Sequence, residues 1–255
     1  MHPVYMYHGV GSGAELDGAD PSYAVSSAHF KNHLRAIGRS VPPAHQLRRK
    51  QGVVAPAVTF DDGHITNFTN AFPALLDAAM TAEFYVNTAM IGRAGFVNWR
   101  QLEQMAQAGM SIQSHGHCHV FLADLDETGL RAELERSKKT IEDRLGHPVA
   151  TLAPPGGRYD RRTVETARAL GYRALAVSRP GLWRRPDQPT VPRFPVYAST
   201  NVQTIKGYLS PWSRDALRAA LRYRAARLGQ RLIGNRRYDA LRDSLLGGAA
   251  LDKTS

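Results

Sequence analysis

The chain has 255 residues, of which 43% are hydrophobic and 22% are charged, as in a globular domain that buries a core. This composition excludes a disordered tail and a disulfide-rich miniprotein. A polytopic membrane protein is also excluded, because no run of about 18 apolar residues occurs. Residues 1–5 lack the basic and apolar regions of a signal peptide, and the one cysteine, Cys118, has no internal partner for a disulfide. Both features predict a cytoplasmic protein.

The positive charge is concentrated at the C-terminal end. The whole chain has 33 basic and 22 acidic residues and a formal net charge of +11. Residues 1–205 hold 22 basic and 18 acidic groups, a net +4, whereas residues 206–255 hold 11 and 4, a net +7. We therefore expect a domain over 1–205 and a basic extension over 206–255, with an anionic partner of some kind.

Short apolar runs alternate with amphipathic helical patterns along most of the chain. Strands are expected at 4–7, 52–60, 83–87, 110–114, 149–153 and 172–178, and helices at 27–38, 69–80, 99–108, 127–145 and 161–170. Pro56 predicts a break or an edge in the second strand, and Pro73 fits only the first turn of its helix. At least five steps of strand followed by helix predict a parallel α/β fold, with a barrel favoured over an open sheet.

A pair of adjacent aspartates follows the strand expected to end at Phe60, in the run TFDDGH. Two carboxylates at the mouth of a strand repel each other unless a cation or a shared proton relieves the repulsion. An ordinary turn built from Asp and Gly is the alternative for Asp61, Asp62 and Gly63.

Three histidines lie within five residues of the run SHGHCH, just past another expected strand. His115 and His119 share a face if the segment forms one helical turn, a common spacing for two imidazoles on a divalent ion. His115 and His117 would share a face on a strand, and a polar surface loop is the third alternative. Cys118 is expected to be a small buried residue.

Together the two clusters indicate a catalytic metal site. One carboxylate and two imidazoles leave coordination positions open for water and substrate. The second aspartate is then free to act as a base toward a water whose pKa the ion lowers to about 7.

These motifs resemble those of the polysaccharide deacetylases, the carbohydrate esterases of family four that share the NodB homology domain. The resemblance spans roughly residues 3–200 and includes YHGV, TFDDG, SHGHCH, LAPPGGRYD and ARALGYRALAVS. It implies a distorted (β/α) barrel of about seven strands, and a zinc ion, with cobalt or nickel as alternatives. It also implies that Asp61 is the general base and that Asp62, His115 and His119 bind the metal. The implied reaction is hydrolysis of an N-acetyl, less often an O-acetyl, group on a sugar.

The third family motif departs from its usual R-P-P-Y-G and here reads Ala153-Pro154-Pro155-Gly156-Gly157. Gly156 can still offer a backbone N–H to an oxyanion. The arginine that would orient the base is missing, and Arg158 and Arg193 are candidates to replace it or to contact substrate. The poly-N-acetylglucosamine deacetylases, which this chain also resembles, lack that arginine as well.

The usual late Leu-x-His motif is absent, since no histidine follows His147. In the same branch the equivalent histidine comes from the N-terminal Tyr-His segment, which makes His8 the candidate general acid. A strand-end histidine bonded to the backbone is the alternative. His64 is a further candidate to face the substrate, or else a solvated loop residue.

The basic extension is expected to form a helix over 213–234, with Leu217, Leu221, Leu228 and Leu232 in one stripe and most arginines off it. Such a helix either packs its stripe on the barrel or rests on anionic lipid or a lipid- or nucleotide-linked sugar. Nucleic acid is not an expected partner, because no binding motif is present and aromatics do not interleave with the arginines.

The sequence therefore predicts a cytoplasmic, metal-dependent sugar N-deacetylase that acts on a precursor or unit of a surface polysaccharide, such as O-antigen or exopolysaccharide. Contact with the inner face of the membrane is a further expectation. The alternatives are a hydrolase of another amide, formyl or cyclic, on the same scaffold, and a catalytically inactive carbohydrate-binding module.

Overall fold

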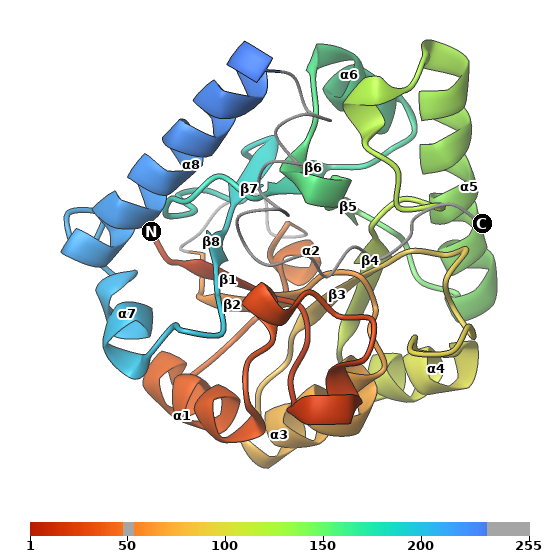
Figure 1. The fold of residues 1–255 in the computed structure, drawn as a ribbon. Helices are drawn as coiled ribbons and strands as arrows, with labels where there is room; N and C mark the ends of the chain where they lie inside the picture. The colour runs from red at the N-terminus through yellow and green to blue at the C-terminus, as the bar shows by residue number, and fades with distance from the viewer. Residues whose placement is uncertain (48–53, 234–255) are drawn as a thin grey trace.

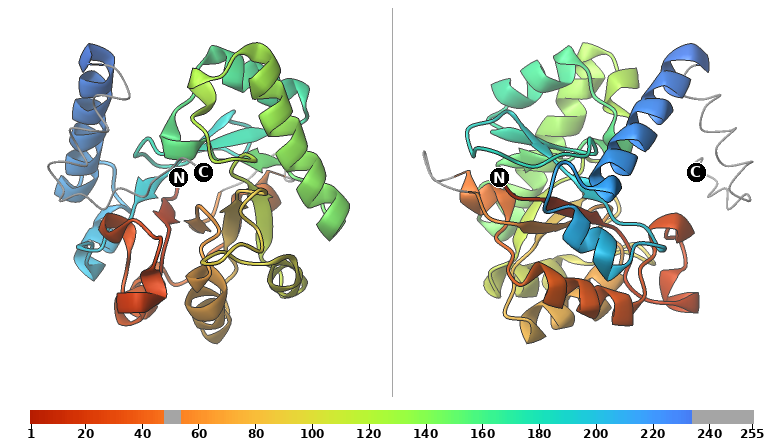
Figure 2. Two further views of the ribbon diagram at one scale, coloured as in Figure 1. Left: turned by 45° about the vertical axis from the view of Figure 1, so that its right-hand side comes forward. Right: turned by 90° about the vertical axis from the view of Figure 1, so that its left-hand side faces the viewer.

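The computed structural model describes residues 1–47 and 54–233, with side chains through residue 230. Eight parallel strands form one sheet in the order β7-β6-β5-β4-β3-β2-β1-β8, and helices surround it (Figures 1 and 2). The strands are β1 (Val4–Tyr7), β2 (Ala57–Phe60), β3 (Glu83–Val86), β4 (Ser111–Ser114), β5 (Thr151–Leu152), β6 (Ala174–Val177), β7 (Thr190–Pro192) and β8 (Phe194–Pro195). The predicted distorted (β/α) barrel is confirmed.

The two edges of this sheet are joined through a single residue, Arg193. Strand β7 pairs with β6 and strand β8 pairs with β1, so the run 190–195 spans both edges and nearly closes the barrel. Arg193 lies between the two strands and is fully buried. The closure therefore brings a charged residue from late in the chain into the barrel.

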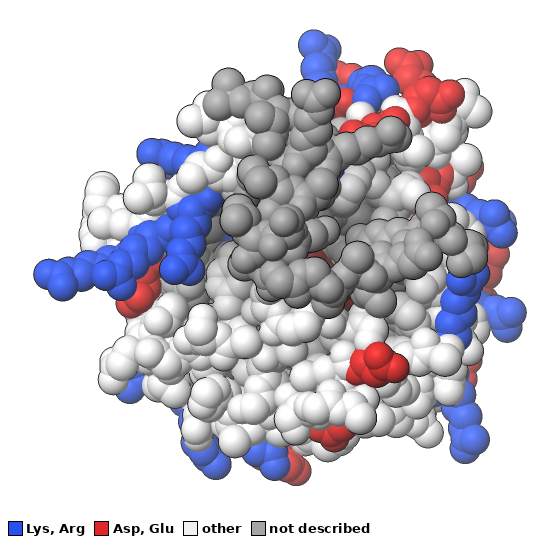
Figure 3. All heavy atoms as spheres, in the orientation of Figure 1, with Lys and Arg blue, Asp and Glu red and all other residues white. Residues whose placement is uncertain are grey.

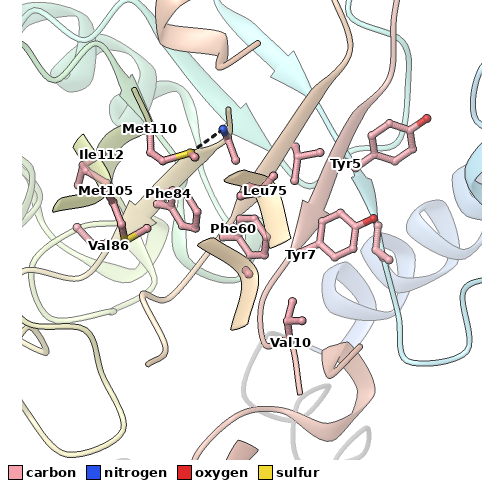
Figure 4. Close-up of a cluster of buried hydrophobic side chains, with 14 of the residues drawn as sticks. Tyr5, Tyr7, Val10, Phe60, Leu75, Phe84, Val86, Met105, Met110 and Ile112 are labelled. Atoms are coloured by element: carbon pink, nitrogen blue, oxygen red, sulfur yellow. Dashed lines mark hydrogen bonds between the residues drawn. The ribbon is translucent and has the colours of Figure 1, made fainter. Parts of the chain in front are cut away.

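Side chains alternate between the two faces of the strands, as the period of two requires. Tyr5, Tyr7, Phe60 and Phe84 belong to a large apolar cluster with residues from the surrounding helices (Figure 4). A second, smaller cluster contains Val4, Ala57, Tyr85, Ala153, Ala174 and Ala176. The small residues in this second cluster leave room for polar side chains beside them.

The helices are α1 (Ser27–Ile37), α2 (Pro43–Gln46), α3 (Phe72–Asp77), α4 (Trp99–Gln107), α5 (Glu127–Leu145), α6 (Arg161–Ala169), α7 (Val202–Gly207) and α8 (Arg214–Ile233). A π-helical segment, Asn67–Ala71, precedes α3, and four short 3-10 turns lie at Gly13–Leu16, Pro21–Tyr23, Leu122–Asp124 and Pro155–Gly157. All five helices expected before residue 171 are present. Helix α3 ends three residues earlier than expected, at Asp77, before Ala79 adopts a left-handed backbone.

Proline explains where the expected and observed strands differ. Strand β2 starts at Ala57, directly after Pro56, as the predicted break requires. The first residues of the longer strand expected there lie partly outside the described ranges. No strand was expected in the Pro-rich stretch 179–192, yet its last residues form β7.

No helix within the described ranges is long and apolar enough to cross a bilayer. Helix α7 spans position 205, where the basic extension was expected to begin, and it packs against α1 and α8.

Candidate active site

The candidate residues follow the carboxyl ends of neighbouring strands. His8 follows β1, Asp61 and Asp62 follow β2, and His115 follows β4. The carboxyl ends of parallel strands meet at one edge of a sheet, where ligands of α/β folds bind. The topology therefore gathers side chains that are far apart in the sequence.

Asp62, His115 and His119 form a compact group of possible metal ligands. The Nε2 atoms of His115 and His119 each lie 3.2 Å from Oδ1 of Asp62. Their ligand atoms all lie within 4.8 Å of one another. Asp62 and His119 have φ values of 73° and 59°, and they are two of the three described non-glycine residues with positive φ. Such backbone strain clusters at functional sites.

This group fits a divalent cation. Nδ1 of His115 lies 2.7 Å from the carbonyl oxygen of Ala153, an arrangement that leaves Nε2 to face the site. Burial alone would lower the pKa of His115, but the charges of Asp61 and Asp62 outweigh it and raise that pKa. The site is therefore strongly negative, and a carboxylate with two imidazoles suits zinc and its neighbours.

Asp61 is held by Arg193 rather than by the group of possible ligands. Nη1 and Nη2 of Arg193 donate to the two carboxylate oxygens at 2.6 and 2.8 Å, and both side chains are buried. Burial alone would raise the pKa of Asp61, but the charge of Arg193, helped by His115 and His8, holds that pKa below its ordinary value. Asp61 is therefore ionised at neutral pH, with lone pairs left for a further contact.

The Arg193 guanidinium lies among other polar groups inside the barrel. Nη1 also donates to the hydroxyl of Thr59 at 3.3 Å, and the guanidinium lies 5.1 Å from the ring centre of Tyr85. The Tyr85 hydroxyl donates to the buried carboxylate of Glu83, which also accepts from Thr151 at 2.7 Å. This network holds the Arg193 guanidinium in place against Asp61. Arg193 therefore makes the contact with Asp61 that was expected of the arginine missing from the third motif.

His8 stands beside the two aspartates. Its ring packs at a tilt against that of Tyr23, with centres 4.4 Å apart, and its Nδ1 is buried with no hydrogen-bond partner among the described residues. Its charge helps to lower the pKa values of both Asp61 and Asp62. A buried ring nitrogen that lacks a protein partner is available to a substrate.

Two residues that were candidates for contact with substrate, His64 and Arg193, bind other parts of the protein instead. His64 is buried and both of its ring nitrogens are occupied, Nδ1 by the Thr66 hydroxyl at 2.8 Å and Nε2 by the Asp17 carbonyl at 3.0 Å. It therefore joins the loop before α1 to the segment after β2. Arg193 points to Asp61 rather than to an open surface.

The structure corrects the expectation for Cys118 and excludes one alternative for the histidines. Cys118 is exposed rather than buried, on a loop whose backbone N–H at Cys118 donates to Glu133. His117 does not join Asp62, since its Nδ1 lies 2.7 Å from the hydroxyl of Thr88.

Gly156 and Arg158 lie on either side of an aromatic ring. A Cβ atom at Gly156, where φ is 61°, would stand 2.7 Å from the Phe121 ring. The Arg158 guanidinium stacks on the same ring, 3.8 Å from its centre. A side chain at Gly156 would therefore meet the ring of Phe121, on which Arg158 stacks.

Glu133 is a residue that the sequence did not single out. Its Oε1 accepts hydrogen bonds from the backbone N–H groups of His117 and Cys118, both at 2.6 Å. It thereby holds the loop that carries His119. The signal that could have identified Glu133 in the sequence is the presence of an acidic residue on the buried face of helix α5, beside Leu130 and Leu134.

Replacing Glu133 by alanine should weaken zinc binding by about 10- to 100-fold, the usual effect of removing a group that orients a ligand. Competition with a chromophoric chelator measures this affinity. Glu135→Ala is the matched control, because Glu135 lies on the same helix and is exposed. Equal zinc affinity in the two variants would show that Glu133 does not orient the loop.

Comparisons with known proteins agree with this geometry. A family model described as polysaccharide deacetylase matches residues 49–175. YxkH of Bacillus subtilis (strain 168), assigned to the polysaccharide deacetylases, is 29% identical over 188 residues. That match covers 70% of this chain, and the chain spans 65% of the length of YxkH.

Solved structures show the same fold. The deacetylase PplD of Streptococcus pyogenes, solved in complex with acetate, matches with a TM-score of 0.73 at 22% identity and covers 82% of this chain and 98% of its own. IcaB from Ammonifex degensii matches with a TM-score of 0.68 at 25% identity, over 86% of this chain and 97% of its own. The match to the family model over residues 49–175, together with the barrel that this chain shares with these structures, shows that the chain contains a polysaccharide deacetylase domain.

Proposed function

We propose that this protein is a metal-dependent hydrolase that removes an N-acetyl group from a sugar. The observation that carries the proposal is the pairing of an ionised, Arg193-bound Asp61 with the adjacent group formed by Asp62, His115 and His119. A base next to an open set of metal ligands is what hydrolysis of an unactivated amide needs. The polysaccharide deacetylase domain supports the same reaction.

Asp62, His115 and His119 would hold the ion, for which we propose zinc, with cobalt or nickel as alternatives. When bound, such an ion supplies a Lewis acid to the amide carbonyl and lowers the pKa of water beside it. Asp61 takes a proton from the attacking water, and Arg193 keeps Asp61 charged and correctly oriented. His8 donates a proton to the leaving amine, and Tyr23 supports its ring. The backbone N–H of Gly156 is proposed to stabilise the oxyanion.

We propose a unit or precursor of a surface polysaccharide, such as O-antigen or exopolysaccharide, as the substrate. The family model and the relative YxkH are both described as polysaccharide deacetylases, which supports a polysaccharide-related substrate. We further propose that this sugar is linked to a lipid or a nucleotide and that the protein meets it in the cytoplasm. Arg158, stacked on Phe121 beside Gly156, is the candidate for contact with such a substrate.

Release of acetate from N-acetylated sugars tests the function. We expect the zinc-loaded protein to release acetate from N-acetylglucosamine oligomers and to leave N-formyl and cyclic amide substrates intact. Preferential release of formate, or opening of a cyclic amide, would identify the protein as a different amide hydrolase. Binding of oligomers without release of any acid would identify an inactive binding module. Free, nucleotide-linked and lipid-linked sugars are compared in the same assay.

A further inference from the structure

Helix α8 packs on the barrel through its alanine side. Ala216 is buried and Ala219 packs against the apolar core, so the small side chains face inward. Asp215, the one acidic residue of the helix, accepts a hydrogen bond from Thr204 of α7 at 3.4 Å. The helix therefore lies along the outside of the barrel beside α7 (Figure 2).

The leucines of α8 lie to one side of the buried alanines and are exposed. Leu217, Leu221 and Leu228 are 51%, 68% and 58% exposed, and their spacing of four and seven places them on one face of the helix. Trp212, just before the helix, is 83% exposed. This arrangement excludes the packing of the predicted leucine stripe on the barrel, although the side chain of Leu232 lies outside the described residues.

We call this surface the leucine face, defined by Trp212, Leu217, Leu221 and Leu228. Single exposed apolar residues are common on soluble proteins, but a row of them marks an interaction surface. Of the seven large apolar side chains that are exposed in the described chain, five lie between residues 209 and 228. The concentration on one short segment indicates a surface that is covered by a partner.

Exposed arginines surround the leucine face. Arg218 and Arg222 lie on one side of the leucines along the helix, Arg224 lies on the other side, and Arg214 is also exposed. Lysine and arginine side chains gather over α8 in Figure 3. An open cavity beneath the helix includes Leu217 in its wall, together with Arg179 and Arg184. The partner must therefore match an apolar strip bordered by positive charge.

We propose that the leucine face binds the surface of an anionic lipid bilayer, with the leucines and Trp212 in the interface and the arginines at the headgroups. Leucines and a tryptophan exposed beside arginines combine apolar area with positive charge, the two contributions by which a helix binds the surface of an anionic bilayer. Each arginine near an anionic surface adds to the attraction, and tryptophan favours the level of the headgroups. A soluble anion would account for the arginines but not for the exposed leucines. The proposal does not depend on the deacetylase activity.

Co-sedimentation of the full chain with vesicles tests this proposal. We expect binding to vesicles that contain phosphatidylglycerol, little binding to pure phosphatidylcholine, and release by high salt. Two variants, L217Q/L221Q/L228Q and R218Q/R222Q/R224Q, should each reduce the bound fraction on the order of tenfold or more. Circular dichroism checks that both variants are folded.

The matched controls are Leu76→Gln, an exposed leucine on α3, and R100Q/R168Q/R173Q, three exposed arginines on other elements. Both controls should bind like the wild type. Equal binding by the wild type and by either α8 variant would overturn the proposal. Sedimentation equilibrium without lipid examines the rival partner, since a dimer that L217Q/L221Q/L228Q dissociates would assign the leucine face to a second copy of the chain.

Discussion

Replacing Arg193 by methionine should destabilise the protein by about 3–5 kcal/mol, because the Asp61 carboxylate is then left buried without its partner. Both side chains are almost completely buried, at 0% and 4% exposure, and they share two hydrogen bonds. Methionine preserves much of the length of the side chain, so the lost charge rather than a cavity dominates the effect. Urea unfolding followed by circular dichroism measures the change.

The loss of stability in Arg193→Met should depend on pH. In the wild type the pKa of Asp61 is lowered, so the pair stabilises the fold above the unfolded value of about 3.9, and this stabilisation is lost as pH falls through the folded pKa. Without Arg193, burial becomes the dominant influence and raises the pKa of Asp61. In the variant, the contribution of Asp61 to stability is then most favourable at low pH, and it becomes unfavourable as pH rises through that raised value. The difference between the two proteins is therefore expected to be large at neutral pH and small in acid.

Arg161→Met is the control, because Arg161 forms an exposed ion pair with Glu165 on α6. It should leave the free energy of unfolding nearly unchanged, because solvent screens an exposed ion pair. The double variant D61N/R193M should recover part of the stability that Arg193→Met loses, since it no longer buries a charge. A loss in Arg193→Met that is as small as the control, or that does not vary with pH, would contradict the role given to this pair.

Replacing Asp61 by asparagine should reduce the rate of acetate release on the order of 100-fold or more, because asparagine cannot accept the proton from water. The bound zinc should remain, since Asp62, His115 and His119 are unchanged. The rate is expressed per folded molecule, because Arg193 loses its charged partner in this variant. Steady-state rates and metal content on the same preparation measure both effects.

Asp77→Asn is the matched control, as Asp77 is an exposed aspartate at the end of α3. It should keep the full rate. If Asp61→Asn loses its zinc together with its activity, Asp61 acts as a metal ligand rather than as the base. If it keeps the wild-type rate, the base is a different residue.

The regular elements were predictable where local signals agree with the packing. Helix α5 has the predicted limits, Glu127–Leu145, because the side chain of Asp126 caps its first turn and Gly146, with φ of 67°, ends it. Strand β7 was missed because it is short, follows Pro189 and ends with Pro192, and pairs at the edge of the sheet. The positions of prolines indicate where the local backbone disfavours a strand. They do not indicate which edges of a sheet meet, so they do not predict the closure of a barrel.

The site was predictable to the extent that it is local in sequence. His115 and His119 were expected to share a face if their segment formed a helical turn. Both lie 3.2 Å from Asp62, but residues 115–119 form a loop rather than a helical turn, so the helical spacing was not the reason. The partner of Asp61 was not predictable with the same certainty, since Arg193 lies 132 residues away and only the closure between β7 and β8 brings it there. The orientation of α8 was also unpredictable, because alanine faces the barrel where the pattern favoured leucine.

Zinc stoichiometry tests most directly whether Asp62, His115 and His119 form the catalytic centre. The chelator-treated protein is dialysed against a low concentration of free zinc, and bound metal is measured together with acetate release. The wild type and His147→Ala, an exposed histidine elsewhere, should each bind one zinc and be active. Asp62→Ala and His119→Ala should bind none at the same free zinc and be inactive. A wild type that binds no metal yet releases acetate, or ligand variants that retain one zinc, would contradict the proposed site.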